Sequence, residues 1–300
     1  MKTKKKRNNE TLSFYLFILP FLIGFSLFTV FPMIMSLLFS FNKISILDYA
    51  QGFWNFNHFQ NYADILSDSK FFIAMKNTFV FAILRVSLTM LIALGFAILL
   101  NKKIPGRKIF RTLIYIPAIL PVVGSAVLWK QLFDGRSSIF SYVLSFVGIH
   151  VDPVLWLGEY GLYSAIFMSI IMNIGPAMII ILAGLQGIPQ DLVEAAQIDG
   201  APAYKIFFRI TLPFISSVLF FLSITNMISC LQTYAEIDLL IGQLSESSMT
   251  MSMLVMYNYK DPRIGLGYSS AMAWLIFLIV LVFTSVYFAC SKNKMFYAGD

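Results

Sequence analysis

Residues 187–213 read GIPQDLVEAAQIDGAPAYKIFFRITLP, and they connect two long apolar stretches of the chain. Pro189 suits the first turn of a helix because its missing N–H would have no partner there, and Asp191 suits the positive end of the helix dipole. Gly200 can adopt the left-handed conformation that ends a helix, and Pro202 can open the next one. The segment therefore predicts a helix of about ten residues between the two apolar stretches.

The predicted helix has one face on which small residues gather. Helical spacing places four residues on this face: Leu192, Ala195, Ala196 and Asp199. Two adjacent alanines allow another backbone to approach closely, while Glu194 lies on a different face and is available to pair with a cation. A short helix of this shape is suited to a groove on a cytosolic protein.

The whole chain has the composition of a membrane protein. Of its 300 residues, 58% are hydrophobic and 12% are charged, and the mean hydropathy is +0.78. Soluble chains carry roughly 25% charged residues, so this composition excludes an ordinary cytosolic enzyme, a disordered chain and a nucleic-acid binder. Cys230 and Cys290 both lie inside apolar stretches, which predicts two inert thiols and no metal site.

Six segments are apolar enough to form helices that cross a bilayer, which takes about 20 residues. Four lie in the charge-free stretches 11–42, 160–190, 210–235 and 264–291, a fifth at 112–129 is just long enough, and a sixth at about 78–100 is apolar except for Arg85. Pro20, Gly24 and Pro32 can kink or end a helix within the first span, at about 12–41. The sequence predicts an all-α membrane protein with six transmembrane helices.

The distribution of Lys and Arg predicts the orientation of these spans. Six spans put both termini on one side, and the four segments on that side carry 14 Lys and Arg. The three alternate segments carry 7, together with ten of the 15 acids. By the positive-inside rule both termini are expected to be cytoplasmic. The basic surplus then reflects topology, and the chain is predicted to be a multi-pass protein of the cell (inner) membrane.

The spacing within residues 187–213 resembles that of a known family. Seven positions match the EAA loop of the membrane subunits of binding-protein-dependent ABC importers: Glu194-Ala195-Ala196, Gly200, Ile210 and Leu212-Pro213. The loop also precedes the penultimate span, as it does in that family. Stretches at 19–24, 59–62, 116–121 and 232–237 are similar to the carbohydrate-type permeases, the group that contains maltose and glycerol-3-phosphate subunits.

The resemblance implies a fold and a division of the chain. The fold is that of a type I ABC importer permease, in which the last five helices form a crossed core and the first wraps a partner. The implied division is a cytoplasmic basic tail (1–11), the first helix with an external segment (12–77), a five-helix core (78–290) containing the loop 187–213, and a cytoplasmic tail (291–300).

The resemblance also implies partners. These are a second homologous permease subunit, two ATP-binding subunits, an extracytoplasmic solute-binding protein and a sugar substrate. The chain has no Gly-Lys dipeptide and hence no P-loop, so ATP and Mg are expected on the partner ATPase, with no catalytic residue and no cofactor here. The residues expected to couple to the ATPase are Glu194, Ala195, Ala196, Asp199, Gly200, Ile210, Leu212 and Pro213.

Polar residues on two of the predicted spans are candidates for the solute path. Ser169 and Asn173 lie one helical turn apart on the fourth span, and Asn226, Cys230 and Thr233 share a face of the fifth. Asn offers both donors and acceptors, which suits a neutral, hydroxyl-rich solute. The alternative role is a hydrogen bond between helices, worth on average about 0.6 kcal/mol in a membrane bundle.

Arg85 is the ionised residue deepest inside a predicted span, and such residues are functional by default. One interpretation places it in the solute path, where it would attract an acidic sugar or a phosphate. The other lets its side chain snorkel to the membrane surface, or places the start of the span deeper than residue 78, and the sequence leaves both interpretations open.

Two other functions compete with a sugar importer. An ion-coupled secondary transporter would usually show internal repeats and intramembrane acids, and no acid lies within the six predicted cores. An ABC permease for a non-sugar solute, such as a glycerol phosphate, would share the loop. A membrane-embedded enzyme is disfavoured because the spans hold no paired carboxylates and no Gly-x-Ser-x-Gly turn.

Overall fold

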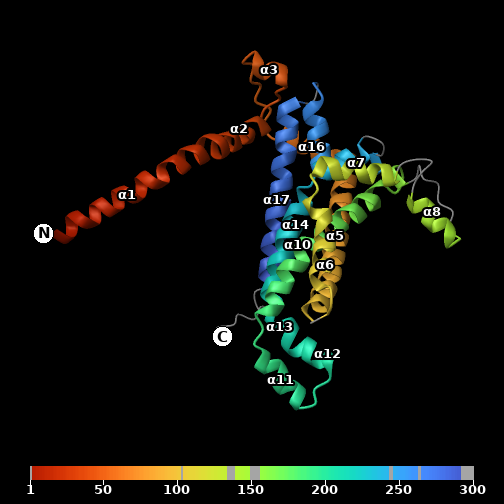
Figure 1. The fold of residues 1–300 in the computed structure, drawn as a ribbon. Helices are drawn as coiled ribbons and strands as arrows, with labels where there is room; N and C mark the ends of the chain where they lie inside the picture. The colour runs from red at the N-terminus through yellow and green to blue at the C-terminus, as the bar shows by residue number, and fades with distance from the viewer. Residues whose placement is uncertain are drawn as a thin grey trace. The chain divides into compact units, whose positions relative to one another are not determined.

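The protein is helical throughout the part of the chain that the structure describes. The structure is a computed structural model (Figure 1), and it describes residues 2–102, 104–133, 139–148, 156–242, 246–262 and 265–291. Within these residues the only β pairing is an isolated bridge between Asn42 and Phe56. This confirms the predicted all-α class.

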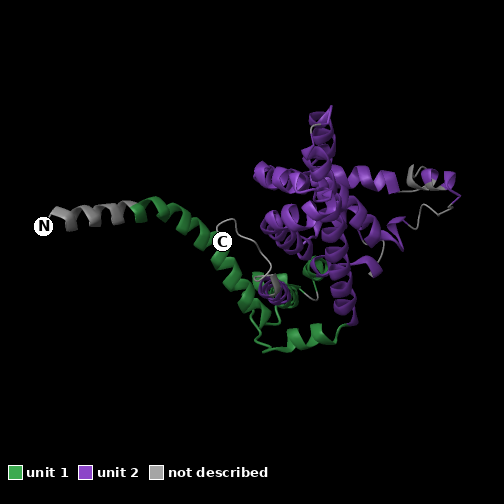
Figure 2. Cartoon of the chain, turned by 90° about the horizontal axis from the view of Figure 1, so that it is seen from below, with its two compact units in different colours: residues 1–68, 255–277 green, residues 69–254, 278–300 purple. Residues whose placement is uncertain are grey.

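The chain divides into two compact units, which Figure 2 shows in different colours. Unit 1 comprises residues 1–68 and 255–277, and unit 2 comprises residues 69–254 and 278–300. The helices of unit 1 are α1 (Lys2–Phe25), η1 (Ser26–Val30), α2 (Phe31–Ser40), α3 (Ile46–Ala50), α4 (Gln60–Ser67) and parts of α16 (Met251–Lys260) and α17 (Gly265–Ser291). Those of unit 2 are α5 (Ser69–Asn101), α6 (Arg107–Ile119), α7 (Val122–Phe133), α8 (Ile139–Phe146), α10 (Gly161–Gln186), α11 (Gln190–Ile198), α12 (Ala203–Ile206), η3 (Phe207–Thr211), α13 (Leu212–Phe214), α14 (Ser216–Leu231), α15 (Ala235–Ile241), η4 (Glu246–Ser248) and the rest of α16 and α17.

Four helices are long and apolar enough to cross a membrane, and two bent pairs raise this number to six if each pair is one span. The four are Phe14–Ser40, Ser69–Asn101, Gly161–Gln186 and Gly265–Ala289. The bent pairs are Arg107–Ile119 with Val122–Phe133, and Ala203–Phe214 with Ser216–Leu231. These six segments correspond to the six spans that hydropathy and charge spacing predict.

The segment 112–129 departs from a straight span. The axes of α6 and α7 differ by 98°, and the break falls at Leu120 and Pro121. Leu120 has an extended backbone with ψ of 135°, because the ring of a following proline disfavours helical geometry at the residue before it. An apolar stretch of the right length therefore forms two short helices instead of one.

The first long helix contains a π-helical turn where the sequence predicts a kink. η1 lies between α1 and α2, and the N–H of Phe31 donates to the carbonyl of Ser26, five residues earlier. Pro32 follows directly and has no N–H to continue the usual i to i−4 pattern. η3 repeats this arrangement, because the N–H of Leu212 donates to the carbonyl of Phe207 immediately before Pro213.

In unit 1, a side-chain amide holds the end of α2. The Nδ2 of Asn61 on α4 donates to the carbonyls of Ser40 and Asn42 at 2.9 and 3.0 Å. The hydroxyl of Tyr62 donates to Ser40 Oγ at 2.8 Å. Gly267 at the start of α17 approaches the Asn42 carbonyl so closely that no Cβ would fit. Carbonyls at the end of α2, which have no partner in the helix, are thus satisfied by other segments.

The core of unit 2 forms where α5 and α10 pack along each other, with α6 and α14 beside them. Small residues permit this packing: Ala93 and Ala97 lie one turn apart on α5 and are fully buried against Met178 and Ile181 of α10. In a bilayer, where lipid is as apolar as leucine, close contact between small residues is a main source of helix association.

Candidate functional site: the loop helix and the polar cluster

The helix α11 has the bounds that the sequence predicts. It begins after Pro189, whose ψ of 126° lies outside the helical region, and it spans Gln190–Ile198. Gly200 adopts a φ of 72°, and its N–H donates to the carbonyl of Gln197 at 3.0 Å. Pro202 then precedes α12. The structure therefore confirms the predicted helix, the left-handed glycine that ends it and the second helix after Pro202.

One face of α11 is exposed. Leu192 is 44% exposed, and Ala195 and Asp199 on the same face are also exposed. Ile198, which is 86% exposed, lies one turn from Glu194 on a neighbouring face. Ala196 is half-buried, so the predicted face is largely open but slightly rotated. Apolar side chains with this much exposure on a helix that projects from the bundle (Figure 1) form a surface suited to a partner.

The other face of α11 lines a polar cavity of about 640 Å³. Val193, Glu194 and Gln197 line it from α11, and Asn101 at the end of α5 lines it with Thr211 of η3. Glu194 forms no ion pair with any residue in the described ranges, and its side chain is exposed. Its carboxylate is therefore directed to the groove between the loop and the ends of α5 and α10.

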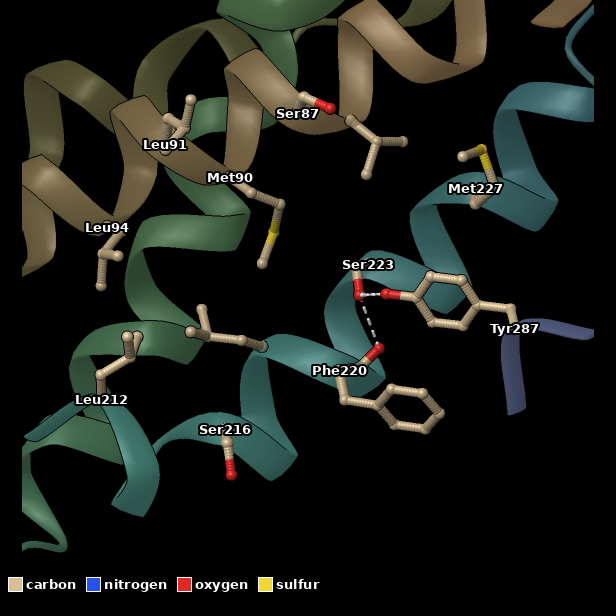
Figure 3. Close-up of a pocket in the computed structure, with 12 residues that line it drawn as sticks. Ser87, Met90, Leu91, Leu94, Leu212, Ser216, Phe220, Ser223, Met227 and Tyr287 are labelled. Carbon is tan, nitrogen blue, oxygen red and sulfur yellow. Dashed lines mark hydrogen bonds between the residues drawn. The ribbon is translucent and has the colours of Figure 1, made fainter. Parts of the chain in front are cut away.

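The last predicted coupling residues connect the loop to the bundle. Ile210 lies in η3, and Leu212 and Pro213 form the start of α13. Leu212 also lines an apolar cavity of about 470 Å³ together with Met90 and Leu94 of α5 (Figure 3). The end of the loop is thus in contact with the space between α5 and α14.

The wall of this cavity is fixed by a hydrogen bond between α14 and α17. Ser223 Oγ and the Tyr287 hydroxyl are 2.6 Å apart, as Figure 3 shows. The ring of Tyr287 also stacks on Phe220 at a centroid distance of 5.4 Å. Both contacts keep Tyr287 in one position against α14.

Most of the predicted solute-path residues hydrogen-bond to their own helix. Asn173 Nδ2 donates to the carbonyl of Ser169 at 2.7 Å, and Asn226 Nδ2 donates to that of Leu222 at 2.8 Å. Thr233 Oγ1 donates to the carbonyl of Ser229 at 2.9 Å. Each is half-buried, so these side chains are held in place on α10 and at the end of α14 without joining the two helices.

Arg85 is buried inside the bundle. The residue is 3% exposed, and its Nη1 donates to Cys230 Sγ at 2.8 Å. This bond joins α5 to α14 in unit 2. The guanidinium is therefore held against α14, and its role in the solute path stays a prediction.

The sequence analysis missed Glu236. Ser169, which is fully buried on α10, donates through its Oγ to Glu236 Oε2 at 2.9 Å. Helical spacing could not place this acid, because α14 ends at Leu231 and Glu236 belongs to the separate helix α15. Glu236 lies outside the six predicted cores, and its carboxylate nevertheless reaches a buried serine of a long apolar helix.

Comparisons with known proteins agree with the fold. Residues 89–293 match the family described as binding-protein-dependent transport system inner membrane component. The probable ABC transporter permease protein YesP of Bacillus subtilis is 33% identical, with 99% of this chain and 96% of that protein covered. The trehalose/maltose transport system permease protein MalF of Thermococcus litoralis is 34% identical, with 97% and 98% covered.

A solved structure shows the same architecture. In the crystal structure of a bacterial ABC transporter that imports the acidic polysaccharide alginate, one chain superposes with a TM-score of 0.82. The match covers 98% of this chain and 99% of that chain at 22% identity, so it establishes the fold. With the family match and two relatives above 30% identity over nearly the whole length, the chain belongs to the inner membrane components of binding-protein-dependent transport systems and has the type I ABC importer permease fold.

Proposed function

We propose that this chain is the permease subunit of an ATP-driven importer for a sugar or oligosaccharide. It forms half of a translocation path with a second homologous permease and receives solute from an extracytoplasmic binding protein. Two ATP-binding subunits bind ATP and Mg, so this chain performs no catalysis. Both termini lie on the cytoplasmic side. The similarity to a trehalose/maltose permease over nearly the full length of both chains supports a saccharide as the solute.

The observation that carries the proposal is the geometry of α11. The helix presents the exposed side chains of Leu192 and Ala195 on one face and Glu194, with Ile198 one turn further along, on another. A groove on an ATPase subunit can cover the apolar face, and a basic residue of that subunit can pair with Glu194. When the ATPase dimer closes, it displaces the loop as a rigid body, and the loop transmits this displacement to α5, α10 and α14.

Reconstituted importer tests this coupling. We expect Glu194→Lys to lower substrate-stimulated ATP hydrolysis at least ten-fold, because it places like charges opposite each other. Gly200→Asp should also lower it, because it adds a negative charge at the C-terminal end of α11, where the helix dipole is negative. Lys205→Ala on α12 is the matched surface control and should retain coupling. Wild-type stimulation in both loop variants would refute the assignment of α11 to the ATPase.

A further inference from the structure

The contact between Ser169 and Glu236 brings a carboxylate onto the predicted solute path. Ser169 is fully buried on α10, and Glu236 is half-buried at the start of α15. Their hydrogen bond of 2.9 Å fixes the carboxylate one helical turn from Asn173. Glu236 thus adds an acceptor-only group to a set of side chains that otherwise offers amides and hydroxyls.

A cation, Arg85, contacts Cys230 on α14. Arg85 donates to Cys230 Sγ at 2.8 Å, and both Arg85 and Glu236 interact electrostatically with Cys230. The two charges do not form an ion pair with each other in the described part of the chain. The guanidinium and the carboxylate are therefore opposite charges within one cluster that joins α5, α10, α14 and α15.

The two charges differ in how accessible they are. Arg85 is 3% exposed, whereas Glu236 keeps part of its surface open. A buried charge without a counter-charge is costly, and Glu236 supplies one nearby. The cluster holds one group of each sign, and the acidic group is the more exposed of the two.

We propose that Glu236 is a specificity-determining residue of the solute path, and that it selects a neutral, hydroxyl-rich saccharide over an anionic one. Sugar hydroxyls donate to a carboxylate in charge-assisted hydrogen bonds, while a uronate or phosphate is repelled by it. Ser169 is the positioning residue that orients the carboxylate. This inference rests on the proposed function, and it reverses the interpretation of Arg85 as an attractor of acidic solutes.

The local charge can be measured without knowing the sugar. The probes are two thiol reagents, anionic sulfonatoethyl methanethiosulfonate and cationic trimethylammonioethyl methanethiosulfonate. They are applied to membranes containing the full importer with Thr233→Cys in a Cys290→Ser background. Cys230 is retained to keep the Arg85 contact, and the Cys290→Ser parent supplies its background labelling. The labelling rate of each reagent is divided by the rate of the same reagent with free 2-mercaptoethanol. This division removes the difference in intrinsic reactivity between the two reagents.

We expect the cationic reagent to be favoured. Glu236→Gln should lower this preference roughly five-fold, as expected for one unit charge removed at close range in a partly hydrated site. Arg85→Gln should raise the preference, because it removes the compensating cation. Asp64→Asn removes an exposed acid of unit 1 and is the matched control, which should leave the ratio unchanged.

Three results would overturn the proposal. One is a preference for the anionic reagent, and another is a ratio that Glu236→Gln does not change. The third is failure of both Thr233→Cys and a second probe, Asn173→Cys, to react with either reagent, because Glu236 would then not face an accessible path. Labelling does not require ATP hydrolysis, so a failure here is separate from loss of the coupling role of α11.

Discussion

A Cβ atom on Gly175 of α10 would lie 2.7 Å from the carbonyl oxygen of Ile114 on α6. It would also lie 2.8 Å from the Cα of Tyr115. Both neighbours are backbone atoms, which cannot rotate away as a side chain can. The approach of α6 to α10 therefore depends on the absence of a side chain at residue 175.

Gly175→Ala should destabilise unit 2. The methyl group forces α6 and α10 apart, and overpacking of this kind costs about 1–3 kcal/mol. The effect is measured as the unfolding temperature of the purified protein. After each heating step, the folded fraction is the part that still elutes as a monodisperse peak in size-exclusion chromatography. Gly95→Ala is the matched control on α5, since nothing lies within 4 Å of its added Cβ. Equal unfolding temperatures for the two variants would show that α6 adjusts without cost.

At Gly200 the constraint is conformational and not steric. Its φ is 72°, yet an added Cβ would meet nothing within 4 Å. Gly200→Ala should therefore cost about 1 kcal/mol through backbone strain alone, while Gly200→Asn should be milder because asparagine tolerates the left-handed region. We expect ATPase coupling to fall in the order glycine, asparagine, alanine. A lower activity for asparagine than for alanine would contradict a backbone origin.

Asn61→Ala should destabilise the end of α2 in unit 1. It removes two donors from the carbonyls of Ser40 and Asn42, and a buried group left without its partner costs about 1–3 kcal/mol. Limited proteolysis across residues 42–57 and thermal unfolding report the loss. Gln60→Ala removes an exposed hydrogen bond to Asp64 and should have little effect. A similar proteolysis rate for both variants would argue against the role of Asn61.

The stability of α3 should depend on pH. The backbone N–H of Ser45, and then its side chain, hold the pKa of Asp48 below its usual value. A lowered pKa means that this stabilisation is fully present above the ordinary Asp value near 3.9, and it is lost as the pH falls through the lower folded value. Hydrogen exchange at residues 46–50, corrected for intrinsic rates, should therefore increase in acid. Asp48→Asn should abolish this increase.

Much of the fold follows from local features of the sequence. Six apolar segments could be located because charges such as Arg209 and Lys292 bound them. The bounds of α11 followed from Pro189, Gly200 and Pro202, each of which acts on its own backbone. Features of this kind need no knowledge of the rest of the chain.

Two of the missed features depend on contacts between distant segments. The position of Glu236 is set by α14 ending at Leu231 and by a serine 67 residues earlier in the chain. Gly175 was not singled out because its neighbour belongs to α6. The bend at Pro121 had a local signal, but the apolar length of 112–129 outweighed it. Hydropathy reports which segments enter lipid and carries no information on which side chains meet.

The π-helical turn before Pro213 has a mechanical consequence. Pro213 has no N–H, so the carbonyls four and five residues earlier, at Arg209 and Phe208, cannot receive a bond from it. The turn joins α12 to α13, so the backbone between the loop and α14 lacks the bond that any residue other than proline would donate at this position. A missing bond of this kind makes bending at residues 208–213 less costly than bending within α14.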